Sequence, residues 1–80
     1  MKSTEYFRNK VMQKRPYLKA EWIEDVVSAP EHTETEEGGR VRCWGYVDQI
    51  GKYLRVVVLE DGVTVHNAFP DRRFLGERKK

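Results

Sequence analysis

Hydrophobic positions alternate with a period of two in the second half of the chain and recur at helical spacing in the first. The clearest stretch is YLRVVVLEDGVTVHNAF, residues 53–69, in which two apolar runs flank Glu60-Asp61-Gly62. Asp-Gly is a strong hairpin signal because both residue types tolerate a positive φ. The pattern therefore predicts antiparallel strands at Tyr53–Leu59 and Val63–Phe69.

Two amphipathic helices are predicted over the first thirty residues. The first covers Thr4–Lys14, where Ser3 or Thr4 can cap it, and Arg15-Pro16 ends it because a residue before proline avoids the α region. The second covers Tyr17–Ser28 and carries a wide apolar stripe. The residues of that stripe are Leu18, Trp22, Ile23, Val26 and Val27.

Two further strands precede the hairpin. His32–Glu37 has the composition of a short acidic edge strand, and Arg40–Tyr46 alternates basic or aromatic residues with small apolar ones. One face of the sheet would then be apolar, formed by Val41, Cys43, Leu54, Val56, Val58, Val63, Val65 and Phe69. We predict an α+β fold in which two N-terminal helices pack on one face of a three- to four-stranded antiparallel sheet.

The same alternation gathers polar and aromatic side chains on the opposite face. These are Arg42, Trp44, Tyr46, Tyr53, Arg55, Thr64 and His66. Arginine binds phosphate through two parallel hydrogen bonds, and Trp and Tyr rings stack on unpaired bases. Arg42, Trp44 and Tyr53 are therefore candidate RNA-binding residues, with Arg72 and Arg73 at the rim.

Arg55 and His66 are the candidate catalytic pair on this face. Nearby guanidinium groups favour a neutral imidazole, which can accept a proton from a ribose 2′-hydroxyl. Arg55 would then stabilise the charge that develops on the phosphate. This chemistry is ribonuclease activity without a metal or another cofactor.

Structural explanations compete with each of these roles. Trp44 and Tyr53 can be cross-strand packing partners, and Arg55 can form a surface ion pair with Glu60, Asp61 or Asp48. His66 can be structural. Asp71 can cap the turn that follows Pro70.

Composition and charge narrow the classes of protein. Eighty residues make one domain, and the single Cys43 excludes an intramolecular disulfide and an all-cysteine zinc site, which fits the cytoplasm. No apolar run approaches the roughly 20 residues of a membrane span. Residues 1–39 carry six Lys/Arg against eight Asp/Glu, whereas residues 40–80 carry nine against five. The strand-rich half is thus basic, and its end, residues 75–80, is expected to fray.

Several short segments, in this order, resemble a family of small uncharacterised bacterial proteins. They are Lys14-Arg15-Pro16-Tyr17, Glu21-Trp22-Ile23, Gly39-Arg40-Val41-Arg42, Trp44-Gly45, Tyr53-Leu54-Arg55-Val56-Val57, Thr64-Val65-His66-Asn67-Ala68-Phe69 and Asp71-Arg72. More distantly, that family resembles RelE/BrnT-like toxins of toxin–antitoxin pairs. The resemblance implies two helices on a curved antiparallel sheet, ribonuclease activity on the exposed face and an antitoxin-like partner.

A second function fits the same face equally well. Arginine and aromatic residues also dominate protein interface hot spots, so the face suits a non-enzymatic module that binds a protein, a second copy of the chain or nucleic acid.

Relatives in the toxin family often carry a histidine early in the first helix, where this chain has Tyr6, Phe7 and Asn9. No role for that histidine transfers here.

Overall fold

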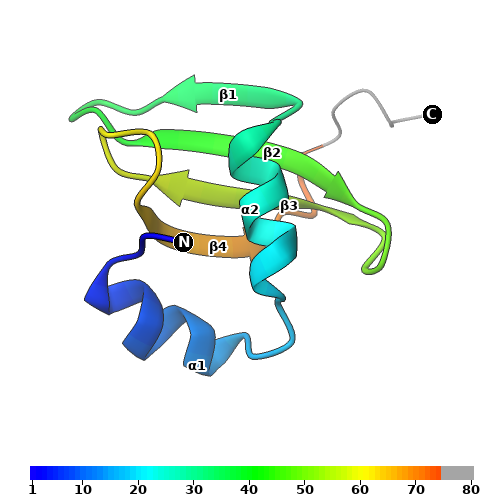
Figure 1. The fold of residues 1–80 in the computed structure, drawn as a ribbon. Coiled ribbons are helices and arrows are strands. Elements are labelled where there is room, and N and C mark those ends of the chain that lie inside the picture. Colours follow the sequence, from blue (N-terminus) through cyan, green and yellow to red (C-terminus); the bar gives the residue numbers. More distant parts are fainter. Residues whose placement is uncertain (75–80) are drawn as a thin grey trace.

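Four strands follow one another in the sheet in the order in which they occur in the chain. The computed structural model describes residues 1–74. The strands are β1 (His32–Thr35), β2 (Val41–Val47), β3 (Lys52–Val58) and β4 (Val65–Pro70), and each pairs antiparallel with the next (Figure 1). The α+β class and the antiparallel sheet predicted from the sequence are confirmed.

The first helix consists of a π-helical turn, η1 (Phe7–Val11), continued by α1 (Met12–Lys14). The Thr4 hydroxyl accepts a hydrogen bond of 3.1 Å from the Phe7 N–H, so Thr4 caps the helix as the sequence predicted. Ahead of the helix, Thr4 N–H donates to the Val65 carbonyl, and Val65 N–H donates to the carbonyl of Lys2. The start of the chain is therefore fixed to β4.

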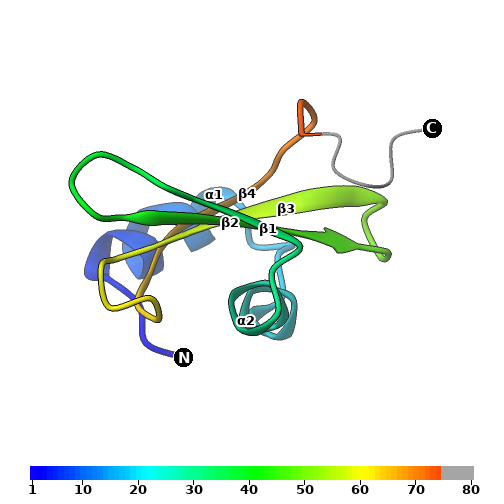
Figure 2. The ribbon, with the colours of Figure 1, turned by 90° about the horizontal axis from the view of Figure 1, so that it is seen from above.

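The second helix, α2 (Ala20–Ser28), is three residues shorter than predicted. The chain turns before it, where Leu18 N–H donates to the Arg15 carbonyl. The two helices also occupy different places: α2 crosses one face of the sheet against β2 and β3, whereas the first helix lies beside β4 (Figures 1 and 2). The prediction had placed both helices on one face of the sheet.

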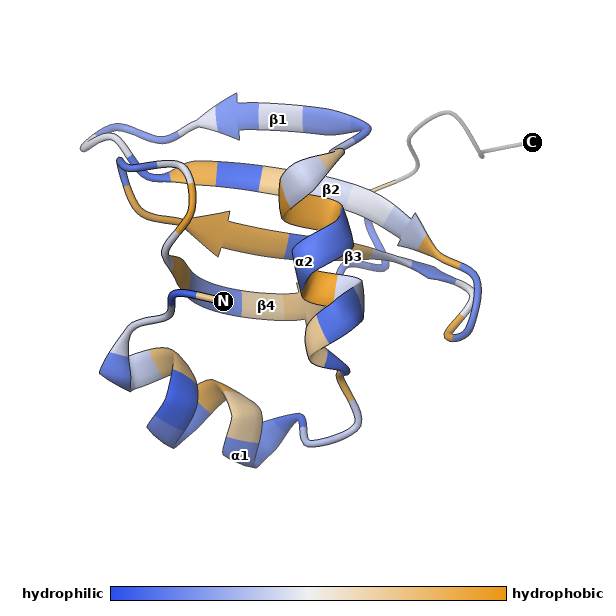
Figure 3. Cartoon of the chain, viewed as in Figure 1, coloured by the Kyte–Doolittle hydropathy of each residue, from blue (hydrophilic) through white to orange (hydrophobic). Residues whose placement is uncertain are grey.

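The hydrophobic core lies between the sheet and the two helices. Figure 3 shows that each helix carries both apolar and polar residues. Its sheet residues include Cys43, Leu54 and Val56, all predicted to point inward. Gly45 lets α2 approach closely, because a Cβ there would lie 3.0 Å from Val26 Cγ2. Burial raises the pKa of the Cys43 thiol, as expected of a core cysteine rather than a nucleophile.

A β-bulge in β4 changes the predicted faces of that strand. Val57 pairs with Asn67 and Val58 pairs with Val65, so His66 is an extra residue on β4. As a result Phe69 pairs with Arg55 and lies on the face away from α2, where the sequence had placed it inside. Val63 was also predicted to be buried, but it precedes the strand and is 49% exposed.

The loop between β3 and β4 is held by the Asp61 carboxylate. It accepts hydrogen bonds from the N–H groups of Val63 and Thr64 and from the Thr64 hydroxyl. The hydroxyl bond is the largest cause that lowers the Asp61 pKa to about 2. Thr64 belongs to this loop, and Gly62 adopts a φ of 76° there, the left-handed conformation expected of Asp-Gly.

Within residues 1–74, no helix is long and apolar enough to cross a membrane. The predicted fraying of residues 75–80 lies outside the described residues.

Candidate functional site

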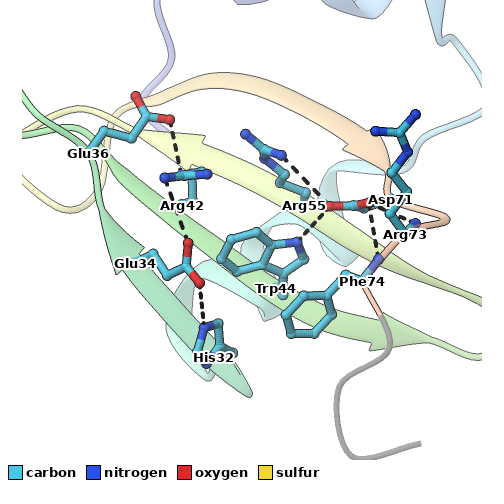
Figure 4. A network of polar contacts seen from close by, with 9 residues as sticks. All are labelled: His32, Glu34, Glu36, Arg42, Trp44, Arg55, Asp71, Arg73 and Phe74. Atoms are coloured by element: carbon cyan, nitrogen blue, oxygen red, sulfur yellow. Dashed lines mark hydrogen bonds and ion pairs between the residues drawn. The ribbon is translucent and has the colours of Figure 1, made fainter. Parts of the chain in front are cut away.

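The face of the sheet turned away from α2 carries most of the residues singled out in the sequence. Pairing between strands aligns His32 with Trp44, Trp44 with Arg55, and Arg55 with Phe69. Glu34 and Arg42 form the next row. We call this surface the far face, and Figure 4 shows its polar contacts.

Arginine and aromatic side chains alternate across the far face. The Arg42 guanidinium carbon lies 5.9 Å from the centre of the Trp44 ring, and that of Arg55 lies 5.5 Å from Trp44 and 5.0 Å from Phe69. Arg15, from the end of the first helix, lies 5.7 Å from Phe69. We refer to these five residues as the arginine ladder, in which each contact is within cation–π range.

Two of these arginines form long ion pairs with carboxylates. Arg42 Nε lies 3.3 Å from Glu36 and its Nη2 lies 3.7 Å from Glu34, while Arg55 Nη1 lies 3.8 Å from Asp71. None of these three contacts has the geometry of a hydrogen bond, and both Nε atoms are buried without a hydrogen-bond partner among residues 1–74. Strong guanidinium–carboxylate bonds are about 2.7–2.9 Å, so part of the donor capacity remains unused.

The partner of Arg55 thus differs from those considered from the sequence. Glu60, Asp61 and Asp48 were the candidates, whereas the structure pairs Arg55 with Asp71. Asp71 follows β4 and is not close to Arg55 in sequence, so no local pattern marks the contact.

Trp44 and Tyr53 are covered by the chain that follows β4. Each is only 4% exposed. The Phe74 ring stacks on Trp44 at 4.7 Å (Figure 4). It also meets the Tyr53 ring edge-on at 4.9 Å. This arrangement supports a packing role for both rings, since a nucleic-acid base has no access to the side that Phe74 covers.

Asp71 anchors this covering segment. Its carboxylate accepts a hydrogen bond of 2.9 Å from Trp44 Nε1 and others from the N–H groups of Arg73 and Phe74, so Asp71 caps the turn after Pro70 as predicted. Burial opposes its ionisation, but these hydrogen bonds outweigh burial, and the pKa of Asp71 lies below its ordinary value. Arg72 and Arg73 are exposed beside it.

The side chain of His66 contacts residues that do not belong to the arginine ladder. Its Nδ1 is 3.1 Å from the Thr4 hydroxyl, and its ring stacks on Tyr6 at 4.9 Å. Burial, followed by the charge of Arg40, lowers the pKa of His66. The neutral form is therefore favoured, as the sequence suggested, although neither Arg42 nor Arg55 is the cause.

The His66 pKa leads to a testable dependence of stability on pH. Because the folded-state pKa is below the ordinary 6.5, the unfolded chain takes up a proton first as the pH falls. The stabilisation is complete above pH 6.5 and is lost as the pH falls through the lower folded-state pKa. We expect His66→Gln to remove this part of the pH dependence, measured by urea unfolding on both sides of pH 6.5. An unchanged profile in the variant would assign the dependence to other groups.

One side-chain cluster on the far face was not singled out from the sequence. His32 Nε2 lies 3.0 Å from Glu34 Oε2, and the other oxygen of Glu34 faces Arg42. The bond to His32 is the main cause that lowers the pKa of Glu34. The signal was the two-residue spacing of His32 and Glu34, which a strand places on one face. No group of three or more metal-ligating side chains occurs in the part of the chain that the structure describes.

Comparisons of the chain with protein-family models, curated proteins and solved structures found no match.

Proposed function

We propose that this protein is a non-catalytic RNA-binding module, an inactive relative of the RelE/BrnT-like ribonuclease toxins. The RelE/BrnT-like form of the fold is part of this proposal and is supported by the order of two helices before an antiparallel sheet. A cytoplasmic location, an antitoxin-like partner and a homodimer stay predictions from the sequence.

The arginine ladder is the observation that carries the proposal. Arg42 and Arg55 are held against aromatic rings, so little side-chain entropy is lost when they bind a ligand. Their long ion pairs leave donors for phosphate oxygens, which accept hydrogen bonds from guanidinium in a bidentate geometry. Arg15 extends the positive charge to the end of the first helix.

The position of His66 supports binding rather than cleavage. A general base must come within about 2.6–3.2 Å of the proton it removes, directly or through one water molecule. In the structure, the Nδ1 of His66 is bonded to Thr4 and its ring is stacked on Tyr6, while Arg55 contacts Trp44, Phe69 and Asp71. The two groups of the catalytic hypothesis therefore have separate partners.

The proposal can be tested with a fluorescent single-stranded RNA of about 12 nucleotides. Fluorescence anisotropy measures its binding to the protein at several salt concentrations. We expect the affinity to fall steeply with salt, because each neutralised phosphate releases counterions. Arg42→Gln and Arg55→Gln are each expected to weaken binding and to reduce the slope of log K against log salt by about 0.7. Lys10→Gln is the matched control, since it removes an equal charge from the exposed side of η1.

Binding that is independent of salt, or equal loss in all three variants, would contradict the proposal. Measuring the length of the RNA after incubation distinguishes non-catalytic binding from the ribonuclease hypothesis. We expect intact RNA; cleavage that disappears in His66→Ala and in Arg55→Ala would restore these residues as a catalytic pair.

A further inference from the structure

A surface hollow of about 540 Å³ lies where the end of the first helix meets the start of β3 and the end of β4. It belongs to none of the groupings predicted from the sequence. The residues that determine its chemistry are Arg15, Tyr17, Lys52, Phe69 and Arg72. Its size is within the range of about 300–1,000 Å³ found for small-ligand sites.

Three cations from three separate segments line this hollow, and no carboxylate of residues 1–74 does. In contrast to Arg42 and Arg55, none of the three forms an ion pair with a carboxylate of residues 1–74. Cations gathered without counterions repel one another, so an anion bound among them gains attraction from each. The electrostatics of the hollow thus favour an anionic ligand.

Aromatic side chains lie next to these cations. Tyr17 is 53% exposed and offers a free-standing ring at the wall. Phe69 lies between the Arg15 and Arg55 guanidinium groups, at 5.7 and 5.0 Å from their carbons. Through Phe69 and Arg15, the hollow is continuous with the arginine ladder.

We propose that this hollow binds the phosphomonoester at one end of an RNA strand, with the terminal base against Tyr17. A phosphomonoester carries a charge of about −1.5 to −2 at pH 7, whereas an internal phosphodiester carries one negative charge. Three cations around one small space match the higher charge. The inference rests on the proposed RNA-binding function and assigns an end of the bound strand to a defined place.

Three forms of one RNA test this inference: with a 5′-phosphate, with a 3′-phosphate and with hydroxyl groups at both ends. We expect one of the two phosphorylated forms to bind about tenfold more tightly than the unphosphorylated form. Lys52→Gln and Arg72→Gln should abolish that preference. Arg42→Gln should weaken all three forms and keep the preference, and Lys10→Gln should change neither. Circular dichroism of each variant confirms that it is folded.

The outcomes distinguish this inference from the proposed function. Equal binding of the three RNA forms would overturn the inference and leave RNA binding in place, whereas no RNA binding at all would overturn the proposed function. In that second case, a nucleoside monophosphate compared with its nucleoside tests the hollow alone by amide chemical shifts. Shifts at residues 15, 17, 52 and 72 with the monophosphate only would support an anion site; their absence would overturn it.

Discussion

Replacing Trp44 with alanine is expected to lower the free energy of unfolding by about 3–5 kcal/mol. Trp44 is almost fully buried although it lies on the far face of the sheet. The change removes the stack with Phe74, the hydrogen bond to Asp71 and the ring that holds two guanidinium groups. Unfolding in urea, monitored by circular dichroism, measures this decrease in the free energy of unfolding.

Trp44→Phe separates the two parts of this effect. It keeps an aromatic ring beneath Phe74 but leaves the Asp71 carboxylate without the indole N–H, at an expected cost of about 1–3 kcal/mol. If Trp44→Ala kept the stability of the protein and lost only RNA affinity, Trp44 would be a stacking platform rather than a packing residue. Its burial under Phe74 would then contribute nothing to the free energy of unfolding.

Phe7→Ala is expected to cost a similar amount, about 3–5 kcal/mol. Phe7 is 2% exposed, and it belongs to the turn that places the first helix against β4. The resulting cavity would lie between the helix and the sheet edge, so amide exchange should accelerate in residues 5–14 more than in α2. Phe7→Leu, which keeps most of the apolar volume, should cost less than half as much. A loss below about 1 kcal/mol for Phe7→Ala would mean that the helix is not anchored there.

The two central strands could be predicted from the sequence because their side chains alternate without interruption. Cys43 and Leu54 were assigned inward, and Arg42 and Arg55 outward, on alternation alone. In β4 the same rule failed. The bulge adds one residue, and beyond an added residue every side chain changes face, which is why Phe69 was placed on the wrong side.

The candidate site was only partly predictable because its decisive contacts join residues far apart in the chain. Trp44 is bonded to Asp71, and His66 to Thr4, across 27 and 62 residues. Alternation placed Arg42 and Arg55 on the outer face of the sheet, but it did not predict that residues 71–74 return over the sheet and cover Trp44. The surface hollow could not be predicted from the sequence either, because its three cations come from segments that share no sequence pattern.

The two outer strands differ in how they end the sheet. The backbone of β4 is occupied at Val65 by residues 2–4, and the first helix lies alongside it, whereas the outer side of β1 has no neighbouring strand in the described chain. All four residues of β1 are exposed. Among the described residues, β1 is therefore the more open edge for another strand, and two copies that paired through β1 would cover both of these edges. An isologous pair of this kind is a closed assembly, because it leaves no open β1 edge for a third copy.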